Sequence, residues 1–245
     1  MRLRALLALL ALLAMPALAQ DEAGRSHELI GQLGGRTALL QLYEVPRADG
    51  SARLSGEYWV LMPLHQRFVE GERSKQLGVT FLKEGSSPIL YGRPGTATLQ
   101  GTWADGAFRG ARFAPGGQER ERFEFSEKFP GMQTYSAQVR CELSAGRYAS
   151  SLEYAVAEGK LQRLEWRSRV EPSGHTCSIV DPVQQPVEGG LRFAAGACTV
   201  TLLDLGEYVR VTAAHCAAAC GSQAYLEPVL VKKRGGCLLL RPPER

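Results

Sequence analysis

The front half of the sequence lacks cysteine, because all six cysteines lie between Cys141 and Cys237. The chain also lacks sustained helical periodicity, since no stretch repeats apolar residues at helical spacing over three turns. After residue 19, no apolar run approaches the ~18 residues that a membrane-spanning helix needs. These absences exclude a helical bundle and an integral membrane helix in the mature chain, and they indicate two unlike halves.

A surplus of one charge sign is also missing. Lys and Arg number 29 against 25 Asp and Glu, and removal of Arg2 and Arg4 with the first segment would leave a net charge of +2. So balanced a chain gives no reason to expect nucleic acid or acidic lipid as a partner. The one dense basic run, Lys232-Lys233-Arg234, follows a predicted strand and is typical of a solvated edge that resists sheet-to-sheet pairing.

Residues 1–19 have the three parts of a secretory signal peptide. Arg2 and Arg4 provide the basic start, an apolar run extends to Met15, and a small-x-small triplet predicts cleavage between Ala19 and Gln20. The cleavage point has no cysteine, so a bacterial lipid anchor is not expected. We therefore expect an exported protein, either periplasmic or secreted.

An even number of cysteines in an oxidising compartment indicates three disulfides. Cys141 and Cys177 flank a predicted hairpin, so we expect a bond between them. A bridge between Cys216 and Cys220 is not expected in an extended segment, because the two α-carbons would lie beyond disulfide reach. The alternative is zinc bound through His215, Cys216 and Cys220. We favour disulfides, with no metal and no cofactor, and the cysteines that would form them are Cys141, Cys177, Cys198, Cys216, Cys220 and Cys237.

Alternating apolar residues bounded by glycine-containing turns predict strands along most of the chain. Asp105-Gly106 and Glu158-Gly159 are two such turns, and 213–219 has the composition of a single helical turn ended by Gly221. The Pro- and Gly-rich stretch Asp181–Gly190 is expected to be a loop. The expected strands cover 38–45, 53–60, 77–83, 96–103, 107–113, 120–125, 151–157, 160–170, 198–203, 207–212, 225–232 and 237–240, with 29–33 left open between strand and helical turn.

The predicted fold class is all-β: an antiparallel barrel or sandwich followed by a smaller disulfide-rich antiparallel β domain. Phe129-Pro130-Gly131 is the best boundary, which gives a signal peptide at 1–19, a glycine-punctuated β domain at 20–130 and a disulfide-rich β domain at 131–245. The aromatic residues of the first domain are expected to form its core, or in part an outward strip that binds sugar or peptide. They are Tyr58, Trp59, Trp103, Phe108, Phe113, Phe123 and Phe125.

The segment Val211-Thr212-Ala213-Ala214-His215-Cys216 resembles the histidine segment of chymotrypsin-like serine proteases. That resemblance implies that His215 is a general base and that Cys216 is disulfide-bonded. The chemistry also needs a serine nucleophile and a carboxylate that orients the imidazole, and in that family both follow the histidine.

The chain behind Cys216 does not provide these partners. It holds one serine, Ser222, without the Gly-Asp-Ser-Gly-Gly surroundings of the family, and two carboxylates, Glu227 and Glu244. An upstream carboxylate such as Asp204 remains an alternative, because triads occur in several chain orders. We interpret the likeness as coincidental and predict no catalytic residues.

Ser55-Gly56-Glu57-Tyr58 resembles the Ser/Gly/Tyr loop of small periplasmic lysozyme inhibitors. That resemblance implies that Ser55 and Tyr58 could hydrogen-bond the catalytic carboxylates of a lysozyme. The alternative is a structural role, in which Gly56 allows close packing between strands.

The tail from Cys198 through the stretch Cys216–Gly221, together with the glycine-punctuated strands before it, resembles uncharacterised exported β-rich proteins of Gram-negative bacteria. That resemblance implies no particular activity. The expected function is that of an exported, non-enzymatic protein that binds a protein or an envelope component. The alternatives are a lysozyme inhibitor and a trypsin-like protease.

Overall fold

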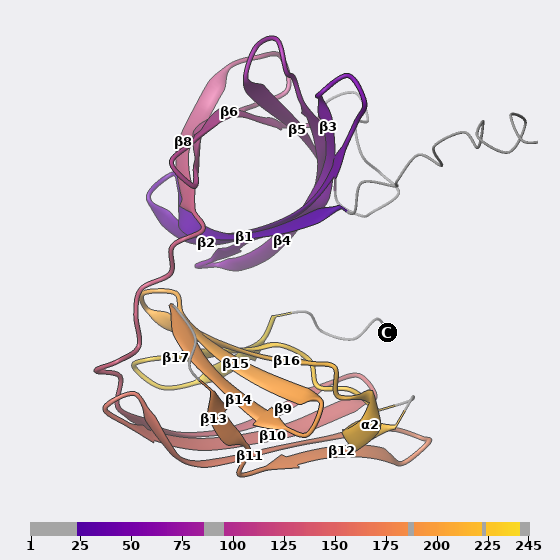
Figure 1. Cartoon of the computed structure of the whole chain (residues 1–245), viewed down its shortest axis with the longest axis vertical. Helices are drawn as coiled ribbons and strands as arrows, with labels where there is room; N and C mark the ends of the chain where they lie inside the picture. Colours follow the sequence, from indigo (N-terminus) through magenta and orange to yellow (C-terminus); the bar gives the residue numbers. More distant parts are fainter. Residues whose placement is uncertain (1–23, 86–95, 186–188, 222–223, 241–245) are drawn as a thin grey trace, which may run out of the picture.

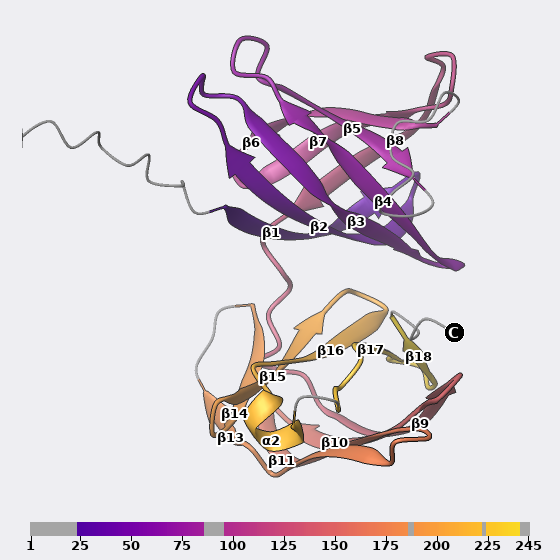
Figure 2. The same cartoon turned by 90° about the vertical axis from the view of Figure 1, so that its right-hand side faces the viewer.

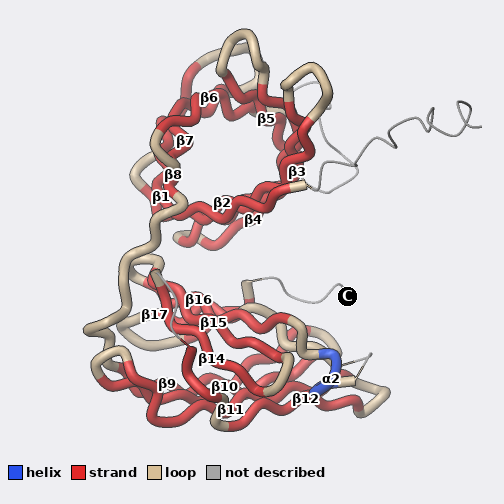
Figure 3. The backbone as a smooth tube through the Cα atoms, in the orientation of Figure 1, coloured by secondary structure: helices blue, strands red, loops and turns tan. Residues whose placement is uncertain are grey.

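Strands make up nearly all the regular structure in this computed structural model of the chain (Figures 1 and 3). The structure describes residues 24–85, 96–185, 189–221 and 224–240. Within these ranges the one helix is α2, Ala217–Cys220, a single turn capped by Gly221. No helix in the described ranges has the length and apolar character needed to cross a membrane. The all-β prediction is confirmed.

Eight antiparallel strands close into a barrel, which Figure 1 shows end-on. Each strand pairs with the next, and β1 closes the ring by pairing with β8. The choice between barrel and sandwich for the front half is therefore decided in favour of a barrel. Its strands are β1 Arg25–Leu33, β2 Arg36–Pro46, β3 Ala52–Leu61, β4 Leu64–Arg73, β5 Val79–Gly85, β6 Thr98–Ala104, β7 Ala107–Phe113 and β8 Glu119–Ser126.

The predicted two-residue turns have the backbone geometry that tight hairpins require. Asp105 and Gly106 have φ of 53° and 72°, and Glu158 and Gly159 have φ of 48° and 69°. Two successive left-handed residues match the right-handed twist of the flanking strands. These turns fix which residues face each other and therefore which face of each strand is buried.

Side chains fill the middle of the barrel. Phe108, Phe123 and Phe125 contact one another in sequence, with ring centroids 4.7 Å and 5.5 Å apart. An eight-stranded barrel is just wide enough for side chains to fill. Because these groups expose almost no surface, this part of the barrel is a core and not a ligand cavity. Fully buried inward residues include Leu29, Leu40, Leu54, Val60, Val69, Leu82 and Leu99.

Glycines on the inward face let neighbouring strands approach closely. A Cβ on Gly71 would lie 1.7 Å from the carbonyl oxygen of Phe81, and one on Gly56 would lie 2.0 Å from that of Gln41. Glycine at such points lets a strand bend where a barrel turns its corner. The structural interpretation of Gly56 fits this geometry. Gly31, Gly101 and Gly110 have similarly close backbone neighbours.

The rear half contains two antiparallel sheets packed face to face, as Figure 2 shows. The first sheet has the order β12-β11-β10-β9, and the second runs from β13 to β18 in sequence. The predicted boundary at 129–131 falls in the connection between β8 and β9. The strands are β9 Ala137–Ala145, β10 Tyr148–Ala157, β11 Lys160–Val170, β12 His175–Val180, β13 Val183–Gln185, β14 Gly190–Ala195, β15 Cys198–Asp204, β16 Tyr208–Ala214, β17 Val229–Lys232 and β18 Cys237–Leu239.

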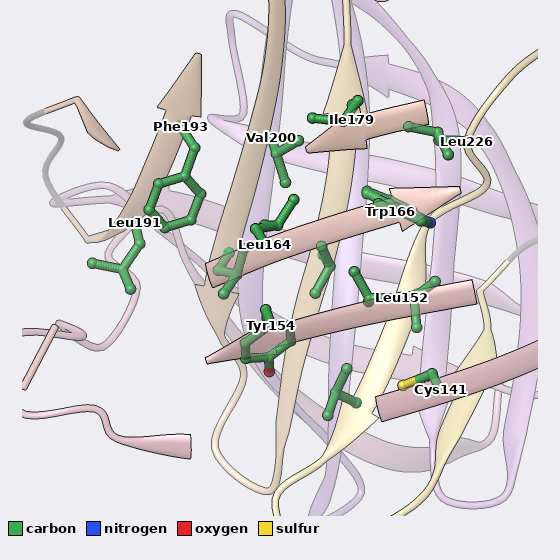
Figure 4. Packing of buried hydrophobic residues seen from close by; sticks show 14 of the residues in the cluster. Cys141, Leu152, Tyr154, Leu164, Trp166, Ile179, Leu191, Phe193, Val200 and Leu226 are labelled. Atoms are coloured by element: carbon green, nitrogen blue, oxygen red, sulfur yellow. The ribbon is translucent and has the colours of Figure 1, made fainter. Parts of the chain in front are cut away.

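The inner faces of these sheets form the largest hydrophobic core (Figure 4). Leu152, Leu164 and Trp166 from the first sheet are fully buried and meet Phe193 and Val200 from the second. The indole Nε1–H of Trp166 donates to Ser150 Oγ at 3.0 Å, so this buried donor is satisfied. The sandwich therefore has a core of its own, separate from that of the barrel.

Three disulfides join the sandwich: Cys141–Cys237, Cys177–Cys220 and Cys198–Cys216. The expected bond between Cys141 and Cys177 is wrong. These residues lie on β9 and β12, the two opposite edges of the four-stranded sheet, three strand spacings or about 14 Å apart. The hairpin that they flank places two strands between them. Cys216 and Cys220 are not bonded to each other, as expected, and both sulfurs are occupied in other disulfides.

The sandwich also packs against the outer wall of the barrel. Leu39, Trp59 and Leu61 of the barrel contact Leu203 and Tyr208 of the second sheet. The second sheet is thus covered on both faces, by the first sheet and by the barrel. Trp59, expected in the barrel core, belongs instead to this contact, because it lies on the outward face of β3.

Several strands were not predicted. Strand β4 was missed because charged residues interrupt its alternation, as in the sequence Leu-His-Gln-Arg-Phe-Val-Glu-Gly-Glu-Arg. Strand β9 and the short strands β12 and β14 were also missed. The loop expected over Asp181–Gly190 is wrong at Val183–Gln185, which form edge strand β13 by pairing with β14. The segment 29–33 is part of strand β1.

Candidate binding groove

His215 lies at the exposed end of β16, with a left-handed φ of 58°. Strands β15 and β16 pair so that Asp204 faces Val209, at the end of the hairpin away from His215. Five residues of strand separate the two, or about 17 Å. Asp204 instead accepts from Lys233 Nζ at 2.8 Å through both carboxylate oxygens. The structure therefore does not bring Asp204 to the imidazole.

Other residues singled out by the protease and signal motifs cannot be placed. Ser222, Glu244 and the expected cleavage site between Ala19 and Gln20 lie outside the described residues. Glu227 is half-buried beside β17, and its backbone N–H donates to Tyr148 Oη at 2.9 Å. Burial raises the pKa of the Glu227 carboxyl.

Ser55 and Tyr58 lie on opposite faces of β3. Ser55 is on the outer wall, whereas Tyr58 is 1 % exposed inside the barrel and donates to Glu84 Oε1 at 2.8 Å. Burial, followed by the Glu84 charge, raises the pKa of the Tyr58 phenol. The structure does not present the two side chains together to another protein.

A polar network surrounds Tyr58 near one end of the barrel. Arg112 holds the carboxylate of Glu84 with both ends of its guanidinium, Nε at 2.6 Å and Nη2 at 3.0 Å. Arg112 also reaches Glu121, which pairs with Arg36. The hydrogen bond to Glu84 is the main reason that the pKa of Arg112 is raised. The positive and negative charges of this network pair with each other. The network therefore fills this end of the barrel without leaving a charge unpaired.

A second network closes the opposite end. His27, 6 % exposed, has Nε2 2.9 Å from Glu44 and Nδ1 2.7 Å from Glu127. Arg73 pairs with the same Glu44. The ring of Trp103 lies 5.1 Å from the imidazole and donates its indole N–H to Thr80. Both ring nitrogens of His27 are therefore engaged by carboxylates within the barrel.

A groove of about 640 Å³ opens along the edge of the sandwich. One wall is the continuous strip from Thr134 to Arg140, which includes the start of β9. The other wall is the β17–β18 hairpin from Val231 to Cys237, and Asp204 also lines the groove. Figure 2 shows β9 and β18 at the same end of the sandwich. The groove therefore lies where an edge strand of each sheet faces the other.

Covalent and polar contacts fix both walls. The bond between Cys141 and Cys237 ties them together at one end, with the α-carbons 5.9 Å apart. The Tyr135 hydroxyl contacts that of Tyr154 at 2.8 Å, and Ser136 Oγ accepts from the N–H of Glu158 at 2.8 Å. A site held in one shape loses little conformational entropy when it binds.

Charged side chains in the groove include Lys233 and Asp204, which pair with each other at 2.8 Å. Arg234, which does not line the groove, pairs with Glu207 at 3.7 Å. Arg140 and Lys232 also line the groove, and neither has a carboxylate within ion-pair distance among the described residues. Burial raises the pKa of Tyr135, and the charge of Asp204 adds to this effect. Because Val139 and Cys141 of β9 and Val231 of β17 face the sandwich core, the alternate side chains of Arg140 and Lys232 point away from it, on the outer faces of their sheets.

Only part of this groove could be anticipated from sequence patterns. The run Lys232–Arg234 was interpreted as a solvated edge, and Arg234 fits that description. The pairing of Cys141 with Cys237, which forms the groove, spans 96 residues and leaves no local pattern. The other wall includes the start of strand β9, Ala137–Ala145, which was not predicted from the sequence.

Comparison of the chain with protein-family models, with curated protein sequences and with solved structures found no match.

Proposed function

We propose that this chain is an exported, non-enzymatic binding protein, and that the groove between β9 and the β17–β18 hairpin is its binding site. The observation that carries the proposal is a groove of about 640 Å³ whose two walls are tied together by the Cys141–Cys237 disulfide. The expected ligand is a segment of another polypeptide.

Export is supported by two independent features. The first residues have the pattern of a signal peptide. In addition, all six cysteines form disulfides within the chain, which is typical of proteins in the periplasm or outside the cell. We assign the protein to one of these compartments.

A binding role is supported by how the polar groups are used. The buried networks around His27 and Glu84 are paired within the barrel wall, and the barrel's middle is filled. His215 makes no hydrogen bond with the residues that the structure describes. A groove with fixed walls is the feature best suited to an interaction with another molecule.

The test is selection of peptides from a random heptapeptide display library, followed by affinity measurement on two matched variants. Thr134→Trp fills the groove from an exposed position whose side chain makes no hydrogen bond in the described part. Thr102→Trp is the control, an exposed threonine on the outer wall of β6. Selected peptides should lose at least tenfold in affinity on Thr134→Trp and less than twofold on Thr102→Trp. Recovery of no peptide, or equal binding to both variants, would contradict the proposal.

A further inference from the structure

From the contacts of His27 we infer a proton-dependent latch in the barrel. The imidazole holds Glu127 against the start of β1 while these side chains share an additional proton, and it releases Glu127 as pH rises. The latch lies in the barrel and does not require the groove of the sandwich to bind a ligand. It follows from the hydrogen-bonding capacity of the groups involved, since an ionised carboxylate only accepts and a neutral imidazole has a single N–H to donate.

The contacts of His27 need one more proton than a neutral imidazole and two carboxylates hold. Nδ1 lies 2.7 Å from Glu127 Oε1, and Nε2 lies 2.9 Å from Glu44 Oε2. Each contact requires a hydrogen atom, so either both ring nitrogens are protonated or one carboxyl group is. In both cases the three groups titrate together. Loss of the additional proton leaves a nitrogen lone pair facing a carboxylate oxygen.

Two arginines balance the two carboxylates around His27. Arg73 of β4 pairs with the carboxylate of β2, and Arg25 of β1 lies 3.8 Å from the carboxylate that follows β8. Strands β5 and β6 contribute Thr80 and Trp103, which carry no charge. With the additional proton the cluster has three positive groups against two negative ones, and without it two against two. Charge balance therefore does not hold the proton permanently.

Glu127 is the carboxylate that leaves when the proton is lost. Its side chain is 33 % exposed, against 8 % for Glu44, so water can replace its contact with the imidazole. Its other partner, Arg25, is largely exposed, and such a pair contributes little. Glu44 is buried and is also held by Arg73. The single N–H of the neutral imidazole therefore stays with Glu44.

The contact that is released lies across the barrel seam with the shortest pairing. Strand β1 pairs with β8 over four residues, 30–33 with 123–126, whereas it pairs with β2 over nine. Residues 25–29 of β1 have no partner in β8. Because Glu127 directly follows β8, its bond to His27 continues the closure with side chains beyond the last backbone pair. Without this bond, the start of β1 and residue 127 can separate.

The test is amide hydrogen exchange of the intact oxidised protein, measured by NMR at pH 5 and pH 8. An ordinary histidine changes charge between about pH 5 and pH 8. The reporter is the Glu127 amide, which donates to the carbonyl oxygen of Gly106 at 3.0 Å. Its protection factor, which corrects for the intrinsic effect of pH on exchange, should be at least tenfold lower at pH 8. Amides in the middle of β10 should keep theirs. Equal protection of the Glu127 amide at both pH values would overturn the inference.

Glu127→Gln distinguishes a latch from a fixed structural contact. A glutamine amide can accept from a protonated ring nitrogen and donate to an unprotonated one, so it can bond to His27 at either pH. This variant should lose the tenfold difference between pH 5 and pH 8. Arg25→Gln is the matched control, because it breaks the same ion pair with Glu127 and leaves the imidazole contacts in place, so it should keep the difference. A Glu127→Gln protein that still opens at pH 8 excludes the latch.

The proton itself can be followed in the same samples. The imidazole nitrogens of His27, assigned by their loss in His27→Gln, or the carboxyl carbons of Glu44 and Glu127 should titrate with the same midpoint as the protection of the Glu127 amide. If none of these groups titrates between pH 5 and pH 8 while the amide loses protection, another group drives the opening and the inference fails. Thermal unfolding checks that each variant is folded.

Discussion

Arg210 of β16 and Glu28 of β1 form an ion pair across the contact between the sandwich and the barrel. Arg210 is only 3 % exposed, and Gln41 of β2 donates to the same Glu28 carboxylate at 2.6 Å. The neighbours of Arg210 in β16, Val209 and Val211, point the other way into the sandwich core. Strand β16 therefore packs against the sandwich core with one face and against the barrel with the other, which explains why it is buried on both faces.

Arg210→Met should destabilise the protein by about 2 kcal/mol at pH 7. That is below the range for fully buried pairs, because Glu28 remains a third exposed. Burial by itself raises the pKa of Glu28, but the hydrogen bond and charge of Arg210 outweigh it and hold the pKa below its ordinary value of 4.5. The stability from the pair is therefore present above pH 4.5 and lost as pH falls through the lowered pKa.

Urea unfolding at pH 7 and at pH 3 measures this effect. The control is Arg109→Met, which breaks the exposed pair with Glu124, and it should change stability by less than about 0.5 kcal/mol. Equal losses of stability in the two variants at pH 7 would mean that the buried ion pair stabilises the protein no more than the exposed one. A loss from Arg210→Met that is as large at pH 3 as at pH 7 would contradict the linkage.

Gly71→Ala should destabilise the barrel by about 3 kcal/mol, because the added methyl group would overlap the carbonyl of Phe81 and force β4 and β5 apart. Ser55→Ala is the control on the outer wall of β3, with an expected change within about 0.5 kcal/mol. Denaturant midpoints measure both. A Gly71→Ala protein as stable as Ser55→Ala would show that the strand bend does not require glycine.

Replacing Cys141 and Cys237 by serine should lower stability by about 4 kcal/mol, because that bond closes a loop with a sequence separation of 96 residues. Replacing Cys198 and Cys216, separated by 18, should have the smaller effect of about 3 kcal/mol. Amide exchange during titration with reductant should show β9–β18 losing protection before β1–β8. Simultaneous loss in both parts would argue that they unfold as one unit.

Glu227→Gln should stabilise the protein at pH 7 by less than about 1 kcal/mol, since solvent screens a half-buried group. Burial raises the pKa of Glu227 above 4.5, so its folded form favours the proton. The wild type therefore loses stability as pH rises from 4.5 through the raised pKa, and the variant does not. Thermal unfolding from pH 4 to pH 7 should show that the stability difference between the variant and the wild type increases with pH. Glu142→Gln, at an exposed position of β9, should show no such trend.

Local patterns predicted most of the strands, because alternation and left-handed turn residues act within a few residues of chain. Asp105-Gly106 and Glu158-Gly159 are examples in which the turn alone set the pairing of its strands. Strand β4 could not be found this way. Its inward positions include Arg73, which is stabilised by Glu44 from β2, 29 residues earlier.

The candidate site could not be predicted from the sequence for a related reason. The groove depends on β9 and the β17–β18 hairpin meeting across two sheets, and on a disulfide between the first cysteine of the chain and the last. The residues singled out by motif were separated by the fold, as Ser55 and Tyr58 show by lying on opposite faces of one strand. Short motifs report on local spacing, whereas a site needs residues from distant segments.

The amino-acid order by itself determined that this chain forms antiparallel strands, since side-chain alternation and turn chemistry are properties of neighbouring residues. It also determined that disulfides can form only in the rear part, because the front half has no cysteine. Only the tertiary structure decided the closure of the barrel, the partners of each cysteine, the docking of β16 between two cores and the groove beside β9. Each of these depends on which distant surfaces pack together, and that is set by the burial of whole faces and not by any short stretch of chain.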